Sequence, residues 1–491
     1  MIKILHPLLG IFFCLTLTSC GWVEGASSKK DRSMPSNPDP ATGPSTQPRP
    51  QPEPGPVGDS SYLPVVDEVF AELRARLSAN KDEFMTAQKD LLTLRYDLSD
   101  HAVSGVTMTR GKPVQGAVRV KLPQGQTWAS LTGTAAHEIR LRGIYPPGFL
   151  PLTHPRHAEG GQILPQFHID AIKAAEGRDL QRFDVEMDLP DHFLPEFPAP
   201  IFLTTRPDLG DVSQGQLVTI KNYFTLFNGI LTPRQLDGVR LLVTSFPQQQ
   251  YNLTDDRRVD TPQQGISCLD CHANGHTNAA THLDPVTRPQ EMRRRLDTPT
   301  LRGVNIQRLF GSQRAIKTIE DFTEFEQLGA YFDGDHVIAA KKGYNKLDRA
   351  LQVAHMAEFQ SLLNFPPAQK LGVDGRLIAD LAAPEELRGE ELFFGKANCA
   401  SCHTAPYYTD NNMYDLATER FYAPQVIAGQ RADGDGLIKT FPLRGIKESP
   451  PYLHDGRLLT LADTVEFFNL VLELRLSEQE KADLVSFLMV L

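Results

Sequence analysis

Two short segments of this chain place thiols and an imidazole at a spacing that suits a covalently bound cofactor. They read Cys268-Leu269-Asp270-Cys271-His272 and Cys399-Ala400-Ser401-Cys402-His403. In each, the thiols lie about one helical turn apart, so that both can form thioethers to haem vinyl groups, and the adjoining histidine offers a ring nitrogen to the iron. A zinc knuckle would need four clustered ligands, and a redox dithiol needs no such histidine. The pattern therefore predicts two covalently bound haem c groups.

The remaining cysteines belong to the N-terminal leader. The chain has six cysteines, and the two outside the motifs are Cys14 and Cys20. The apolar run from Leu5 to Leu17 is short for a bilayer span and follows one early positive charge, which predicts a signal peptide over residues 1–19. Its end, Leu17-Thr18-Ser19-Cys20-Gly21, resembles a bacterial lipobox, so Cys20 is the expected lipidation site. The alternative is an ordinary secretory signal cut nearby.

Residues 20–61 have the composition of a tether. From Ala26 to Ser61 the sequence is dominated by Pro, Ser, Gly and Gln, and such a segment cannot bury enough apolar surface to offset the entropy of ordering. We expect a disordered, lipidated linker that holds the folded part away from a membrane. The formal net charge of −10 argues against a nucleic-acid surface.

An internal repeat organises the C-terminal half. At an offset of 142 residues, 301–325 and 443–467 share seven identities in 25 positions. Each copy follows a Cys-x-x-Cys-His motif and precedes an amphipathic run, 347–363 in one case and 477–491 in the other. In the first run Leu347, Leu351, Phe359 and Leu362 recur at helical spacing, as a core-facing stripe does. The repeat predicts two tandem helical haem domains, 229–366 and 385–491.

Residues 62–228 carry no recognisable motif. A helical start over 66–94 is followed by alternating apolar segments and many prolines, which favours an α+β accessory region. The histidines of this region are expected to be solvated rather than metal-bound; among them are His137, His154, His157 and His168. The expected fold is thus mainly α, with two cytochrome c-like domains preceded by the accessory region and the tether.

Four further stretches carry a family resemblance. They are Thr232-Pro233 with Leu241-Leu242, the segment 298–302, the segment Arg388-Gly389 to Gly395, and Pro451-Tyr452-Leu453-His454-Asp455-Gly456. Together with the haem motifs they resemble the bacterial dihaem cytochrome c peroxidase and MauG family, over roughly 232–491. Each stretch is weak alone and specific in combination.

The resemblance implies a division of labour between two haems. One reacts with hydrogen peroxide, and the other takes electrons from a small donor protein, a cytochrome c or a cupredoxin. It implies His272 and His403 as proximal iron ligands, with Cys268, Cys271, Cys399 and Cys402 as attachment points. The export signal predicts a periplasmic location, which suits a c-type cytochrome because bacteria attach the haem on the outer side of the inner membrane. With the lipobox, a lipoprotein of the outer membrane is expected. Whether calcium lies between the domains, as in some relatives, stays open.

The sixth iron ligands are harder to assign. His276 and His282 follow the first motif closely, and His282 is the candidate for a removable ligand and hence for a catalytic role; a propionate partner or a polar loop residue is the alternative. His454 falls on the side of the second haem by the repeat, with ligation and structural hydrogen bonding both open. Met413, ten residues after His403, is a candidate for the second iron, although a methionine is more often packing.

Three departures from the family pattern bear on the chemistry. Gly311 stands where relatives have a tryptophan between the haems, and Phe467-Phe468 stand where relatives supply a methionine or tyrosine ligand. No general acid or base is identified, since Glu324 and Asp333 are only nearby carboxylates. Peroxide reduction is the first expectation. The alternatives are a dihaem electron carrier without catalysis and an oxidase similar to MauG that acts on a protein or polymer.

Overall fold

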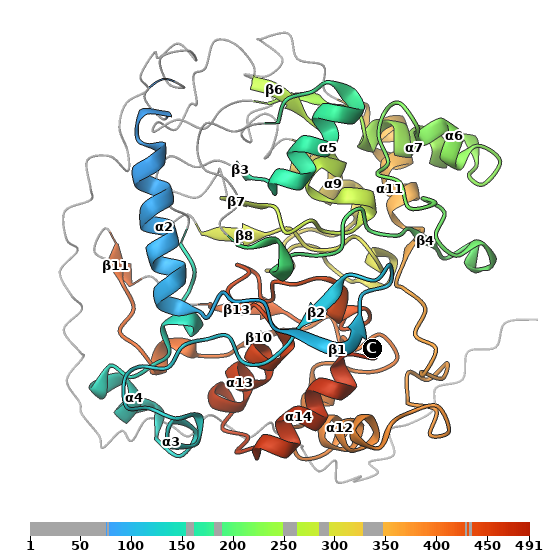
Figure 1. The fold of residues 1–491 in the computed structure, drawn as a ribbon. Helices are drawn as coiled ribbons and strands as arrows, with labels where there is room; N and C mark the ends of the chain where they lie inside the picture. Colours follow the sequence, from blue (N-terminus) through green and yellow to red (C-terminus); the bar gives the residue numbers. More distant parts are fainter. Residues whose placement is uncertain are drawn as a thin grey trace, which may run out of the picture. The chain divides into compact units, whose positions relative to one another are not determined.

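The computed structural model describes most of the chain from residue 78 onward (Figure 1). The described residues are 78–153, 162–180, 189–248, 263–283, 294–327, 347–427 and 435–491, together with 75, 430 and 431. They belong to one unit, residues 53–491. Cys20, the leader and the tether lie outside them. None of the described helices is long and apolar enough to cross a membrane.

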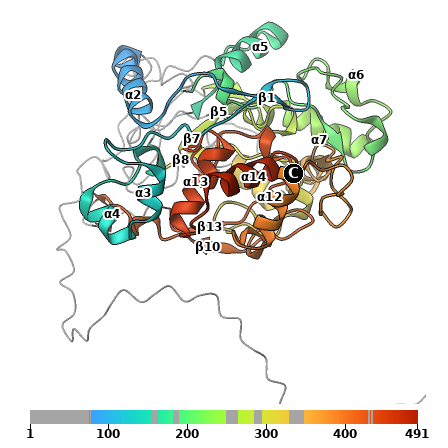
Figure 2. The same ribbon diagram turned by 60° about the horizontal axis from the view of Figure 1, so that its bottom comes forward.

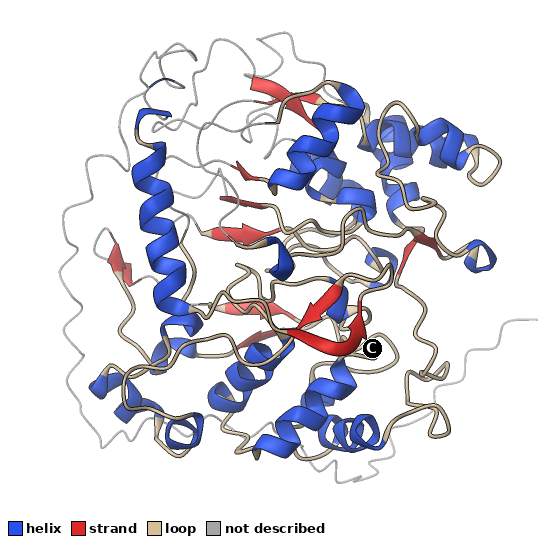
Figure 3. Ribbon diagram, in the orientation of Figure 1, coloured by secondary structure: helices blue, strands red, loops and turns tan. Residues whose placement is uncertain are grey.

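Helices and loops make up most of the described structure, with only small sheets (Figure 3), as the mainly helical expectation required. The α-helices are α2 (Lys81–Arg95), α3 (Trp128–Thr132), α4 (Ala136–Arg142), α5 (Gln166–Glu176), α6 (Tyr223–Phe227), α7 (Pro233–Leu242), α8 (Cys268–Cys271), α9 (Ile319–Glu326), α11 (Ala354–Gln360), α12 (Pro384–Phe394), α13 (Leu461–Val471) and α14 (Glu478–Leu488).

The strands are short and pair antiparallel. Two-stranded sheets join β1 (Ala102–Thr107) to β2 (Pro113–Gln115), β4 (Phe202–Leu203) to β9 (Leu363–Asn364), β5 (Phe246–Gln248) to β6 (Gln263–Ile266), β10 (Met413–Asp415) to β13 (Leu437–Lys439), and β11 (Val426–Ile427) to β12 (Gln430–Arg431). One sheet has the order β3 (Gln162–Ile163), β7 (Thr281–Leu283), β8 (Arg295–Asp297).

Two helix pairs are packed through a glycine in the same way. Helix α7 packs against α11, as Figure 1 shows, and α12 packs against α14, which lies beside it in Figures 1 and 2. A Cβ on Gly238 would lie 2.1 Å from the His355 carbonyl oxygen, and one on Gly389 would lie 2.0 Å from that of Asp483. Glycine is therefore required at both crossings, because any side chain would separate the helices.

The backbone also repeats at the offset found in the sequence. Gly303 and Gly445 adopt left-handed conformations, with φ of 73° and 69°, and each precedes a 3₁₀ turn, Val304–Ile306 in one copy and Ile446–Glu448 in the other. Isolated bridges follow at Phe310 with Ile316 and at Tyr452 with Leu458. Then Thr318 and Thr460 cap α9 and α13 through their side chains. The internal repeat is thus a repeat of structure.

The second repeated run matches its expectation, and the first does so only in part. Ser477 caps α14, which covers most of the predicted run. In the other copy a π-helical turn, Arg349–Val353, precedes α11. Phe359 is buried as predicted, but Leu351 is 60% exposed, so its assignment to the core-facing stripe was wrong. The wide turn changes the angle between successive side chains, and a 3.6-residue period no longer describes it.

The accessory region has no core of its own separate from the C-terminal half. Most buried apolar residues between Leu92 and Leu194 share one cluster with those from Phe393 to Leu491. Those in and around α5 instead join Phe246, Ile266 and Ala280. Those between Ile201 and Phe227 join the cluster built around α7 and α11. Residues before the first haem motif therefore pack into both repeats.

Buried carboxylates join the accessory region to the second repeat. Asp463 Oδ1 accepts hydrogen bonds from the backbone N–H of Arg119 at 2.6 Å and of Val120 at 2.9 Å, while its Oδ2 accepts from residues that begin α13. Glu448 Oε1 accepts from the Thr109 backbone at 2.9 Å and hydroxyl at 2.7 Å. Backbone groups of one region are thus satisfied by side chains of the other.

Candidate functional site

Both Cys-x-x-Cys-His motifs fold into a single helical turn. The His272 backbone N–H donates to the Cys268 carbonyl at 3.0 Å, and that of His403 donates to Cys399 at 2.9 Å. All four cysteines are half-buried. The turn brings both thiols and the ring of each motif close together, which is the arrangement that thioether attachment and axial ligation need.

The two histidines lie deep in the protein but keep an accessible face. Burial lowers the pKa of His272 to about 4 and also lowers that of His403, so both rings are neutral at pH 7, the form that binds a metal. Each residue nevertheless retains intermediate solvent accessibility. The donor set of two thiols and a neutral imidazole fits a haem at each motif.

Backbone carbonyls orient these rings. His403 Nδ1 donates to the Tyr408 carbonyl at 2.9 Å, which leaves Nε2 for an iron. His272 Nδ1 is buried and makes no hydrogen bond, although the nearby Pro299 carbonyl acts on the pKa of the ring. The Phe441 carbonyl acts on the pKa of the His403 ring in the same way. Residues 299 and 441 are equivalent in the repeat.

The accessory region anchors the first motif. Arg178 donates to both carboxylate oxygens of Asp270, at 2.9 and 3.0 Å, and His168 Nε2 lies 3.6 Å from Asp270 Oδ1. Burial raises the pKa of Asp270, but His168 and Arg178 more than offset this and bring it to about 2. His168 is fully buried on α5, so the expectation that it is solvated was wrong. His137 is exposed, as expected, and His154 and His157 lie outside the described residues.

His454 belongs to a buried charged cluster. Its Nε2 lies 3.8 Å from Asp435, and its Nδ1 is buried without a hydrogen bond. Arg457, fully buried, pairs with Asp435 at 2.5 Å and with Asp455 at 3.1 Å. Tyr145 of the accessory region is among the groups that act on Arg457. Single-sequence reasoning could not find this cluster, because the residues come from distant segments.

The two histidines that follow the first motif, His276 and His282, have different surroundings in the structure. His276 Nδ1 contacts the Thr300 hydroxyl and its Nε2 the Glu448 carbonyl, both at 2.8 Å, so neither ring nitrogen is left for an iron. His282 lies on β7, opposite Gln162 and Leu296, and it is half-buried. A charge on His282 would lower the pKa of His272, so the two rings are near each other.

Around the second motif, Tyr414 and Met413 lie on strand β10. Burial raises the pKa of Tyr414, with Cys402 among the neighbouring groups that add to the shift, and its hydroxyl donates to Asp410 at 2.5 Å. Met413 is opposite Lys439 on β13 and points to the other face of the strand. This arrangement favours packing rather than ligation for Met413, whose role as a ligand stays a prediction.

The aromatic pair Phe467-Phe468 and the carboxylate of Glu324 make packing and ion-pair contacts. Phe467 is buried in α13 and Phe468 is partly buried, with ring centroids 5.3 Å apart. Glu324 forms an ion pair with Arg349, and Asp333 lies outside the described residues. This ion pair favours a surface role for Glu324.

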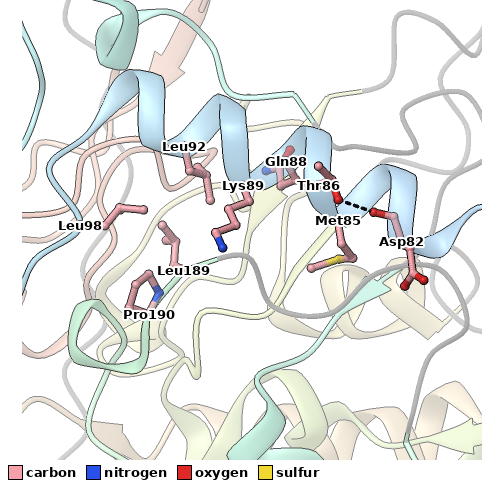
Figure 4. A pocket seen from close by; sticks show the side chains of 9 residues that line it. All are labelled: Asp82, Met85, Thr86, Gln88, Lys89, Leu92, Leu98, Leu189 and Pro190. Atoms are coloured by element: carbon pink, nitrogen blue, oxygen red, sulfur yellow. Dashed lines mark hydrogen bonds between the residues drawn. The ribbon is translucent and has the colours of Figure 1, made fainter.

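A pocket of about 560 Å³ beside α2 contains none of the predicted site residues (Figure 4). Its lining is Asp82, Met85, Thr86, Gln88, Lys89, Leu92, Leu98, Leu189 and Pro190. In the described ranges, no three His, Cys, Asp or Glu side chains are grouped to hold a metal ion.

Comparisons with known proteins agree with the motifs. The chain is 33% identical over 120 residues to the methylamine utilization protein MauG of Methylorubrum extorquens, which covers 21% of this chain and 33% of that one. It is 31% identical over 146 residues to the cytochrome-c peroxidase IdrP1 of Denitromonas iodatirespirans, covering 21% and 39%. The matches thus span about a third of these relatives. The family resemblance stated from the sequence is confirmed.

A solved structure, that of a MauG-like protein associated with microbial copper homeostasis, aligns with a TM-score of 0.33 at 21% identity, over 46% of this chain and 81% of the other. No family model matches the chain.

Proposed function

We propose that the chain, which is similar over part of its length to MauG and the cytochrome-c peroxidases, is a dihaem c-type cytochrome that reduces hydrogen peroxide with electrons from a small redox protein. The donor would be a cytochrome c or a cupredoxin. The observation that carries the proposal is the pair of helical turns that hold Cys268, Cys271 and His272 in one copy and Cys399, Cys402 and His403 in the other.

In this proposal the protein supplies attachment, axial ligation and orientation. The bound haems would supply the redox-active iron. His272 and His403 are neutral and buried, and the Tyr408 carbonyl fixes the tautomer of His403 with its Nε2 available to the metal. His282 is the proposed removable ligand at the first haem and Met413 a candidate at the second.

The two halves, 229–366 and 385–491, are proposed to be tandem cytochrome c-like domains. The support is the repeated packing at Gly238 and Gly389 and the repeated capped helices α9 and α13. In each copy the glycine after the repeated Leu-Arg donates to the carbonyl at the end of the amphipathic run: Gly303 to Leu363 and Gly445 to Leu491, both at 2.9 Å.

We propose that the protein works in the periplasm, tethered to the outer membrane through a lipid on Cys20. The lipobox-like sequence and the Pro-rich linker support this. Fractionation of cells that express the wild type or C20A tests it. The wild type should follow the membranes and the variant should be released to the soluble fraction or remain unprocessed; identical membrane fractions would contradict the anchor.

A non-catalytic electron carrier is the second candidate. Gly311 in place of the tryptophan expected between the haems, and Phe467-Phe468 at the position of a ligand, favour it. An oxidase that acts on a protein or polymer is the third, since the accessory region is large and packs into both repeats. These candidates differ in the coordination state of the irons and in their response to peroxide.

The deciding experiment uses the full-length protein with its haems attached. Mass spectrometry should show two covalent haems, and EPR of the half-reduced protein should show one high-spin iron that changes on addition of peroxide. Reduced cytochrome c or cupredoxin should then be oxidised with turnover. Two low-spin haems that ignore peroxide would refute the peroxidase proposal and support the carrier.

A further inference from the structure

A buried lysine joins the two repeats at their contact. Lys439 ends β13, and its side chain is 3% exposed. Its backbone N–H donates to the Ser312 carbonyl at 2.8 Å, within the turn closed by Phe310 and Ile316. This turn contains Gly311, the position without the expected tryptophan. Lys439 therefore belongs to the second repeat by sequence and contacts the first.

The contacts of this ammonium group are neutral. Nζ donates to Gln307 Oε1 at 2.8 Å and to the Leu309 carbonyl at 2.7 Å, and it lies 5.7 Å from the centroid of Phe310 and 5.3 Å from that of Phe441. Carbonyls and aromatic faces offset part of the cost of burying a charge. No ion pair links Lys439 to a carboxylate in the residues that the structure describes.

A second cation faces the same place. Arg314 is half-buried, and its Nε is shielded from solvent without a hydrogen-bond partner. Burial lowers the pKa of Lys439 to about 8, and the positive charge of Arg314 acts in the same direction. The two cations repel each other, and no carboxylate among the described residues neutralises them. The pair therefore lacks an anionic partner.

The position of this pair indicates where the anion comes from. Phe441, two residues after Lys439, presents its carbonyl to the proximal histidine His403. A Cβ added at Gly311 would meet no atom within 4 Å, so space remains beside the turn. The two cations are thus near the second haem motif and next to unfilled space.

We propose that Lys439 and Arg314 form a binding site for a carboxylate, and that its ligand is a propionate of the haem attached to Cys399 and Cys402. This inference rests on the proposed function, because it needs that haem. A fixed positive charge beside a haem favours the reduced iron, which carries one positive charge less. The pair therefore raises the reduction potential of the second haem and helps it to accept electrons.

The test compares K439M, K439R and R314Q in the full-length protein with its haems attached, and K396M is the matched control. Lys396 is exposed, lies in the same repeat and pairs with Glu480. Mass spectrometry first counts the covalent haems, and spectroelectrochemistry then gives the potential of each. K439M and R314Q should keep both haems, while the reduced-to-oxidised ratio of one haem falls roughly tenfold at fixed potential. K439R and K396M should match the wild type.

The outcomes separate the possible failures. Unchanged potentials in K439M and R314Q with both haems attached would overturn the inference. Lys439 would then have a structural role, and its substitution would lower only the stability of the protein. Wild-type potentials that follow added inorganic phosphate at constant ionic strength, with K439M insensitive, would overturn the propionate assignment in favour of a free anion. A wild type without covalent haem would instead defeat the proposed function, which the first measurement reveals.

Discussion

Replacing Gly389 by alanine tests the helix crossing that supports the second haem motif. The added Cβ would lie 2.0 Å from the Asp483 carbonyl oxygen and 2.7 Å from the Phe487 Cβ. A backbone oxygen cannot move to another rotamer, so α12 and α14 must separate by more than an ångström to reach normal contact. Overpacking of this kind costs about 1–3 kcal/mol, and the better helix propensity of alanine returns about 1 kcal/mol. We expect a net loss of about 1 kcal/mol, the difference between the middle of the first range and the second value.

The separation should also reach the haem motif. Phe393 of α12 and Phe487 of α14 have ring centroids 5.3 Å apart, and Phe393 lies 5.5 Å from Tyr408. The Tyr408 carbonyl orients His403. G389A should therefore lower the midpoint of chemical denaturation and also alter the absorption band of one haem.

Gly133→Ala provides the control, because Gly133 has φ of −84° and a Cβ there would make only ordinary contacts, at 3.6 and 3.8 Å. Its denaturation midpoint should stay the same or rise slightly. G238A tests the first repeat in the same way. If G389A were as stable as G133A, the close approach of the two helices would be refuted.

Three further predictions concern packing and charge. F359A should destabilise by about 3–5 kcal/mol and L351A by less than about 0.5 kcal/mol, and comparable losses in denaturation would contradict the exposed position of Leu351. R178M leaves Asp270 buried without its guanidinium partner, so the midpoint should fall by the equivalent of about 3–5 kcal/mol; an unchanged midpoint argues against the anchor. Burial raises the pKa of Asp463 to about 6 from 3.8, so its contribution is present below pH 3.8 and is lost as pH rises through about 6. The denaturation midpoint of the wild type should therefore fall between pH 3.8 and 6 by more than that of D463N. Parallel pH profiles of the two proteins would contradict the raised pKa of Asp463.

The features that the sequence predicted well are local. A Cys-x-x-Cys-His turn, the amphipathic helical run that begins at residue 477 and a repeated Leu-Arg-Gly are fixed by residues within a few positions, and all appear as expected. The repeat was detectable because both copies retain their capping and turn residues. Glycines 238 and 389 carried a signal too, since a glycine within a helical run costs stability and needs a packing reason.

The features that the sequence missed depend on distant segments. Nothing near His168 indicates that it is buried against Asp270, because the two residues are 102 positions apart and meet only through the packing of α5. Lys439 reads as an ordinary strand-end cation until its contacts with residues 307–310 are known. Leu351 was misassigned because a π-helical turn has no simple hydrophobic period.

The shared core described for the accessory region has a consequence for the order of folding. Most of the buried apolar residues between 92 and 194 lie in one cluster with residues 393–491, so about two hundred residues must be made between the two main parts of this cluster. The cluster formed by residues 201–363 needs no later segment and can close first. The residues around the first Cys-x-x-Cys-His motif should therefore fold before the N-terminal region can pack against residues 393–491. A chain truncated before α12 would keep that early nucleus and expose the apolar surface of residues 92–194 to aggregation.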